Sequence, residues 1–112
     1  MTTIVNIKKA QLNKRNIKDF QTWNNLKHTL YIGRNMSVYV KGTNESIWKN
    51  PFSVKKYGRD KCLELYETYI KNNKELYDKL NELENKELGC WCKPEQCHGD
   101  ILIKLLNEKI KK

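Results

Sequence analysis

The stretch ELGCWCKPEQCHGDILIKLL, residues 87–106, constrains the fold of this chain more than any other segment. Its first part, Glu87 to Cys92, is typical of a strand, and the part from His98 onward has leucine and isoleucine at helical spacing. Only residues 93–96 join the two. A strand that leads directly into a helix is the unit from which α/β domains are built, so we expect a sheet covered by helices.

The rest of the chain repeats this alternation of strands and helices. Further strands are predicted where β-branched or aromatic residues alternate with others, at Thr3–Lys9, Thr29–Arg34 and Ser37–Gly42. Further helices are predicted where apolar residues recur every three or four positions, at Arg59–Lys71 and Lys74–Glu84. The segment Ala10–Lys27 is compatible with a short helix or an ordered loop. We therefore expect a single α/β domain over residues 1–112, with a partly parallel sheet flanked by helices.

The charge of the chain is strongly basic, with a formal net value of +9 from 22 basic and 13 acidic residues. The only arginines are Arg15, Arg34 and Arg59, so lysine supplies almost all of the positive charge. Lysine is a strongly hydrated point charge, whereas arginine is the usual reader of bases and phosphates. We expect nucleic-acid binding that is weak at most and falls steeply with salt.

The apolar residues occur in short runs, and none of these runs has the eighteen or so residues that a membrane span needs. The N-terminus MTTIVNIKKAQ has no apolar core of the kind found in signal peptides. We therefore expect a cytoplasmic protein with no membrane partner, whose cysteines stay reduced or bind a metal.

A zinc site is one interpretation of the C-terminal motif, with Cys90, Cys92, Cys97 and His98 as its ligands. The spacing argues against it, because structural sites place two to four residues between paired ligands and adjacent helical residues diverge. We expect no metal or other cofactor, and four free thiols.

A reactive or ligand-binding site is the second interpretation of this motif. Cys97 and His98 fall where the last helix begins, and the partial positive charge there stabilises a thiolate or a bound anion. Gly99 would let a ligand approach the backbone. Asp100 would either cap the helix or accept hydrogen bonds from a sugar. Core packing is the third interpretation; it is favoured for Cys62 and stays open for Cys90 and Cys92.

Four segments of the chain carry a family resemblance: VNIKK at 5–9, YIGR at 31–34, WKNPF at 48–52 and LGCWCKPEQCHGDIL at 88–102. In this order they resemble the uncharacterised family of domains of unknown function numbered 4326, which occurs in bacteria, phages and large DNA viruses. The family usually has glycine where this chain has Lys49. The resemblance implies a small α/β domain whose motif residues converge, and it implies no particular reaction.

A pocket at the ends of the strands would bring these motifs together. We expect Arg34 to pair with an anionic group, Trp48 or Phe52 to stack on a ring, and Asn50 to read polar edges. The complete expected set has Cys97 and His98 in catalysis and the ligand held by Arg34, Trp48, Asn50, Phe52, Cys92, Gly99 and Asp100. The favoured ligand is a nucleotide-derived small molecule, and whether the protein is an enzyme stays open. The alternatives are a zinc-stabilised accessory module and a weak, lysine-driven nucleic-acid-binding protein.

Overall fold

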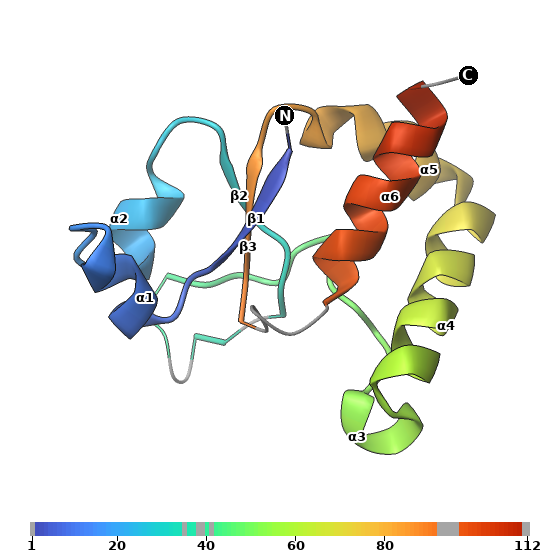
Figure 1. The fold of residues 1–112 in the computed structure, drawn as a ribbon, viewed down its shortest axis with the longest axis horizontal. Helices are drawn as coiled ribbons and strands as arrows, with labels where there is room; N and C mark the ends of the chain where they lie inside the picture. Colours follow the sequence, from blue (N-terminus) through green and yellow to red (C-terminus); the bar gives the residue numbers. More distant parts are fainter. Residues whose placement is uncertain (1, 35, 38–39, 41, 92–96, 111–112) are drawn as a thin grey trace.

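A three-stranded parallel sheet forms the centre of the molecule, with strand order β1–β3–β2 (Figure 1). The computed structural model describes residues 2–34, 36–37, 40, 42–91 and 97–110. The strands span Thr3–Asn6 (β1), Thr29–Tyr31 (β2) and Glu87–Cys90 (β3). Thr3 and Thr29 both pair with Glu87, so the three strands start at one edge of the sheet and end together at the other.

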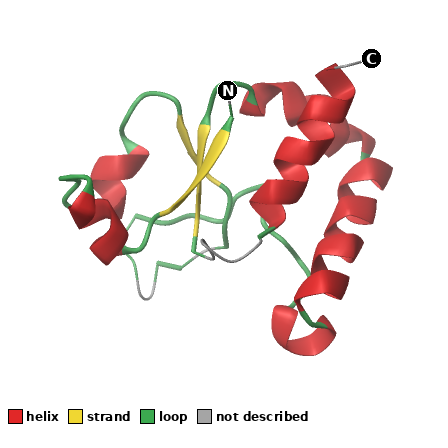
Figure 2. Ribbon diagram, viewed as in Figure 1, coloured by secondary structure: helices red, strands yellow, loops and turns green. Residues whose placement is uncertain are grey.

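Helices cover both faces of the sheet, as Figure 2 shows by colour. One face carries α1 (Lys9–Lys14) and α2 (Phe20–Asn24). The helices on the other side of the molecule are α3 (Val54–Tyr57), α4 (Arg59–Asn72), α5 (Lys74–Lys79), the 3₁₀ helix η1 (Leu80–Leu83) and α6 (His98–Ile110). This arrangement confirms the expected α/β class. No helix in the described part of the chain is long and apolar enough to cross a membrane.

Two hydrophobic cores lie on opposite faces of the sheet, because successive strand residues point to opposite sides. Leu88 and Cys90 of β3 belong to the larger core, with buried residues of α4, η1 and α6. Val5 of β1 and Tyr31 of β2 face the smaller core, which also contains Leu12 of α1. The central strand is therefore buried on both sides, as expected for a parallel sheet.

Gly89 allows α2 to lie directly on the sheet. A Cβ atom at this position would lie 2.4 Å from the indole ring of Trp23. The same indole donates a hydrogen bond from Nε1 to Glu87 at 2.8 Å, and Glu87 also forms an ion pair with Arg15. Two residues of β3, Glu87 and Gly89, thus hold the indole ring of Trp23, and Glu87 also holds the guanidinium of Arg15.

One region differs from the sequence-based expectation. The predicted strand at 37–42 is wrong: its described residues Ser37, Val40 and Gly42 lie in turns and a bend, and residues 38, 39 and 41 are outside the described part. Buried Thr43 explains the turn, since its hydroxyl accepts from Met36 N–H and donates to the carbonyl of Val40. Every pairing of the described strands is parallel.

Candidate functional site

A cavity of about 360 Å³ lies at the edge of the sheet where the strands end. It is bounded by the residues that follow β2, by the loop and α3 before α4, by the end of β3 and by the start of α6. Five of the expected site residues line it, namely Arg34, Asn50, Phe52, Cys97 and His98. The structure thus brings together residues from segments that lie far apart in the sequence, as ligand sites in open parallel sheets do.

Arg34 fixes one wall of this cavity. Its guanidinium donates from Nη2 to the carbonyl oxygens of Asn50 at 3.0 Å and Phe52 at 3.3 Å, and from Nε to that of Asn50. The planar guanidinium suits such paired contacts better than a lysine would. Arg34 therefore contributes positive charge to the cavity and also holds the loop that forms the wall.

The side chain of Asn50 is occupied within the protein. Its Oδ1 accepts from the backbone N–H of Phe52 at 2.9 Å, across Pro51, and its Nδ2 donates to Sγ of Cys62 at 3.1 Å. The Cys62 thiol in turn donates to the carbonyl of Phe52. The expectation that Asn50 reads the polar edges of a ligand is therefore not what the geometry shows: this amide shapes the loop.

The two aromatic residues of the WKNPF motif have different places. Trp48 is 2% exposed, belongs to the larger core and does not line this cavity, so of the two residues expected to stack on a ring only Phe52 is placed to do so here. Its carbonyl oxygen accepts a 2.6 Å hydrogen bond from the hydroxyl of Tyr66 on α4. Phe52 lines the cavity, half-buried, with edge contacts to Tyr57 and Tyr69.

His98 begins α6 and points its imidazole at the end of β2. Its Nε2 lies 2.7 Å from the carbonyl oxygen of Ile32. A carbonyl can only accept, so Nε2 carries the hydrogen and Nδ1 is left as the acceptor of the neutral ring. Burial lowers the pKa of His98 below its usual value, against the opposing effect of the Ile32 contact. The ring is consequently neutral at pH 7 and packs against the edge of Tyr66.

Cys97 precedes His98 and lies against Cys90 at the end of β3. The two sulfurs are 3.4 Å apart, Cys97 donating to Cys90, and both side chains are 2% exposed. This hydrogen bond, together with burial, raises the pKa of the Cys97 thiol well above its usual range. The start of the helix was expected to stabilise a thiolate or a bound anion; the raised pKa favours the neutral thiol at Cys97, which leaves the bound anion as the open alternative.

The next two residues of α6 also act within the protein. Asp100 accepts from the backbone N–H of Cys97 at 3.0 Å, which caps the helix, one of the two roles expected for it. A Cβ atom on Gly99 would come within 2.7 Å of Ile4 and 3.0 Å of Ile32. Gly99 therefore permits close packing of α6 on the sheet, and it does not line the cavity.

The zinc interpretation involves Cys92, which lies outside the described residues, so the complete set of four ligands is not placed by the structure. Among the described residues, no three or more histidine, cysteine, aspartate or glutamate side chains are grouped so that they could hold a metal ion. Cys92, expected to bind ligand and also a member of the alternative zinc set, lies outside the described residues.

The charged side chains of the described residues that line the cavity are all positive, with His98 neutral. Besides Arg34, the lining includes Lys55 of α3 and Arg59 at the start of α4, and none of the described lining residues is a carboxylate. Neither Lys55 nor Arg59 was predicted as a site residue from the sequence, although both follow the WKNPF motif within a few residues. Their position just after that motif could have indicated them, because helices that directly follow a loop in the cavity wall also border the cavity.

This architecture defines a small three-layer α/β domain with a ligand-sized cavity at the carboxyl edge of its parallel sheet. Comparison of its sequence with known families then places it: the profile of the family described as "Domain of unknown function (DUF4326)" matches residues 15–108, and the chain belongs to that family. This confirms the family resemblance; the motifs at 31–34, 48–52 and 88–102 lie within the matched residues, and the motif at 5–9 precedes them.

Two viral proteins are similar to this chain over most of its length. One is "Uncharacterized protein R718" of Acanthamoeba polyphaga mimivirus, 38% identical over 85 residues, which are 68% of this chain and 65% of the relative. The other is "Uncharacterized 12.4 kDa protein in nrdA-td intergenic region" of Enterobacteria phage T4, 31% identical over 70 residues, 59% of this chain and 65% of that protein. The chain therefore spans just under two thirds of each relative. No solved structure gives a significant match.

Proposed function

We propose that the cavity at the carboxyl edge of the sheet binds an anionic small molecule derived from a nucleotide. The observation that carries this proposal is the lining itself: three cationic side chains, Arg34, Lys55 and Arg59, with no carboxylate among the described lining residues. A site of one sign attracts and orients a ligand of the opposite sign. The volume of about 360 Å³ is in the range of small-molecule sites.

A ring system in the ligand would have Phe52 as its partner. Phe52 is half-buried at the cavity wall, and its ring is held by edge contacts with Tyr57 and Tyr69. A ring fixed in this way stacks on a flat heterocycle without losing side-chain freedom on binding. The phosphate would then lie toward Lys55 and Arg59, because these cations flank the loop that carries Phe52.

Catalysis through His98 and Cys97 is the further part of this proposal. The neutral imidazole offers Nδ1 as a hydrogen-bond or proton acceptor, since Nε2 is committed to Ile32. The neutral Cys97 thiol is a proton donor rather than a nucleophile in this state. General acid–base chemistry on a bound nucleotide derivative therefore fits the pair better than attack by a thiolate.

Native mass spectrometry of freshly purified protein tests the binding proposal directly. We expect a fraction of the molecules to carry an added mass in the range of a nucleotide derivative, lost on mild activation. The same spectra report bound zinc, which we expect to be absent. A stoichiometric zinc adduct in place of an organic ligand would favour the alternative of a zinc-stabilised module.

A further inference from the structure

Two free cysteines face each other inside the cavity, and neither binding nor acid–base chemistry needs them as a pair. Cys90 is the last residue of β3 and Cys97 immediately precedes α6. Their sulfurs lie 3.4 Å apart without a covalent bond, and both residues line the cavity. Each side chain is 2% exposed, so the cavity is the route by which a small reagent would reach them.

The fold holds these sulfurs together. Cys90 lies in the central strand, where its neighbours pair on both sides. The start of α6 is fixed by the bond from Cys97 N–H to Asp100 and by that between His98 and Ile32. The close contact is therefore set by the sheet and the helix, and does not depend on the two side chains alone.

The third free cysteine of the described part provides a contrast. Cys62 lies on α4, where its thiol donates to the carbonyl of Phe52 and its sulfur accepts from the amide of Asn50. Its sulfur is thus engaged in the loop that forms the cavity wall. Proximity to another described thiol distinguishes Cys90 and Cys97 from it.

We propose that Cys90 and Cys97 form a redox-active pair that exchanges between the dithiol and an intramolecular disulfide, with a low-molecular-weight disulfide as the oxidant. The sulfurs need to approach by about 1.4 Å to reach bonding distance, which is within the range of side-chain rotation. In a reducing compartment such a bond is formed transiently, as in redox-sensing or catalytic pairs. The proposal does not depend on which ligand the cavity binds.

The exchange balances in two steps. Cys90, which accepts the hydrogen bond from Cys97, loses its proton to solvent, and its sulfur attacks the oxidant disulfide. This forms a mixed disulfide and releases one small thiol after protonation. Once Cys90 is in the mixed disulfide, the hydrogen bond that held Cys97 as a neutral thiol is disrupted. Cys97 then loses its proton to solvent and attacks the Cys90 sulfur, forming the Cys90–Cys97 bond and releasing the second small thiol. Two protein thiols are oxidised and one small disulfide is reduced to two thiols.

Thiol counting in glutathione buffers tests this pair. Purified protein is equilibrated for hours at pH 8 over a series of reduced-to-oxidised glutathione ratios, quenched in acid, unfolded and alkylated with N-ethylmaleimide. Intact mass then gives the number of free thiols. We expect four in reducing buffer and two in oxidising buffer. We expect the same loss of two in Cys62→Ser and in Cys92→Ser, and no such loss in Cys90→Ser or Cys97→Ser.

A second measurement covers variants that fail to fold. Trypsin leaves Cys90, Cys92 and Cys97 in one peptide, because Lys93 is followed by Pro94. Oxidised wild-type protein is therefore alkylated, reduced and labelled with iodoacetamide, and fragmentation of this peptide locates each label. We expect the iodoacetamide label, which marks thiols released by reduction, on Cys90 and Cys97 only. The proposal is overturned if all four thiols stay free across the buffer series, or if the iodoacetamide label falls on Cys92 or Cys62.

Discussion

The guanidinium of Arg34 lies 3.0 Å from the carbonyl oxygen of Asn50, sixteen residues further along the chain. This contact joins the end of β2 to the loop that forms the cavity wall. It changes what a substitution of Arg34 would reveal, since a loss of ligand binding could arise from a loosened wall as well as from a missing charge. The contribution of the Arg34–Asn50 hydrogen bond to the free energy of unfolding should therefore be measured before ligand binding is compared.

Replacing Arg34 with alanine should lower the free energy of unfolding by about 1 kcal/mol, because it removes charge-assisted bonds to two backbone carbonyls at a solvent-accessible position. Urea unfolding followed by circular dichroism measures the change. Lys27→Ala is the control, as Lys27 is exposed and has no bonding partner in the described part of the chain. Equal stability of the two variants would show that Arg34 does not hold the wall.

Trp91 directly follows β3, where it borders the cavity and also packs in the smaller core, so it provides a test of that packing. Its half-buried indole donates from Nε1 to the hydroxyl of Tyr31 at 2.8 Å and packs near Phe20 in the smaller core. Trp91→Phe should cost about 1 kcal/mol through the lost hydrogen bond, and Trp91→Ala about 3 kcal/mol through the lost packing. Thermal unfolding should rank them in that order. Equal effects of the two changes would contradict a packing role for the ring.

The fold class could be predicted from the sequence, because apolar residues that alternate in strands or recur at helical spacing show which face of each element is buried. The helix predicted at 59–71 forms as Arg59–Asn72, and that beginning at His98 runs to Ile110. The strand predicted at 37–42 failed because Thr43, a residue outside the alternating pattern, closes a turn through side-chain hydrogen bonds. Such local bonds compete with strand pairing and are not visible as periodicity.

The candidate site was predictable in its location and less so in its residue roles. Because ligands bind where parallel strands end, Arg34, Cys97 and His98 were expected at one site, and all three line the cavity. Residue type alone could not show that the Asn50 amide donates its hydrogen bond to Cys62 Sγ, or that Gly99 packs against Ile4. Those roles depend on which partner each side chain meets, and these partners come from distant segments.

The pH dependence of stability should contain a contribution from His98. Burial lowers its folded pKa, so at a pH just below the usual value of about 6.5 the unfolded chain binds a proton that the folded protein does not. The stability contributed by the neutral ring is therefore complete above about pH 6.5 and is lost as the pH falls toward the folded pKa. Urea unfolding from pH 7.5 to 5 should show this decline.

Two variants isolate that contribution. His98→Gln should flatten the decline, because glutamine keeps a donor for the Ile32 carbonyl and does not titrate. His28→Asn is the matched control: His28 is exposed and has a positive φ of 66°, which asparagine tolerates. An unchanged decline in His98→Gln would show that another group is responsible.

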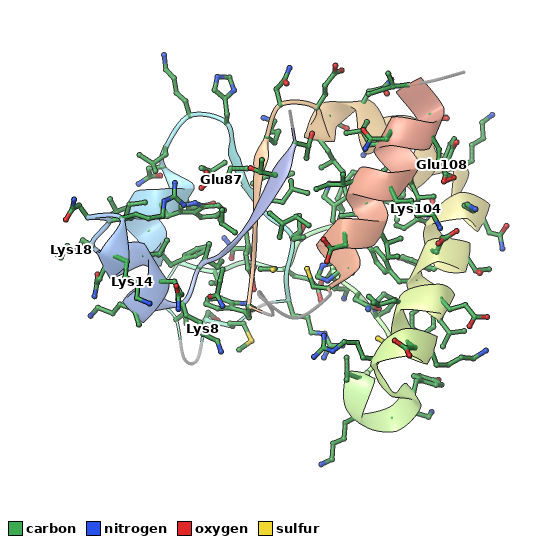
Figure 3. The ribbon with its side chains drawn as sticks, in the orientation of Figure 1. Lys8, Lys14, Lys18, Glu87, Lys104 and Glu108 are labelled. Atoms are coloured by element: carbon green, nitrogen blue, oxygen red, sulfur yellow. The ribbon has the colours of Figure 1, made fainter. Side chains whose placement is uncertain are left out.

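The basic charge is not evenly distributed along the chain. Residues 1–58 contain eleven lysines and arginines and two acidic residues, whereas residues 59–112 contain eleven of each. Lys8, Lys14 and Lys18 lie on or beside α1, well away from Lys104 and Glu108 of α6 (Figure 3). In the part of the chain that the structure describes, these three lysines have no ion-pair partner, while Lys71 and Lys104 both pair with Glu67.

Any nucleic-acid binding should therefore depend on the α1 side and on salt. Fluorescence anisotropy with a short DNA duplex should show weak binding. The slope of the logarithm of the binding constant against the logarithm of the salt concentration should become shallower by about 0.9 for each phosphate contact removed. We expect this effect for Lys8→Gln, Lys14→Gln and Lys18→Gln combined. The control combines Lys71→Gln, Lys79→Gln and Lys104→Gln, an equal charge change at paired lysines. Sequence-specific binding that persists at physiological salt would contradict this expectation.

The cavity proposal is tested most directly by calorimetric titration with AMP, ADP and ADP-ribose. Lys55→Gln combined with Arg59→Gln removes two cations from the lining, and Lys56→Gln combined with Lys61→Gln removes two neighbouring cations outside it. Melting curves establish that both variants are folded. The account predicts that wild-type protein and the Lys56/Lys61 variant bind at least one of these ligands alike, and that the Lys55/Arg59 variant binds it about tenfold or more weakly, a difference of about 1.4 kcal/mol. Equal affinity of the two variants, or no binding of any of the three ligands by the wild type, would contradict it.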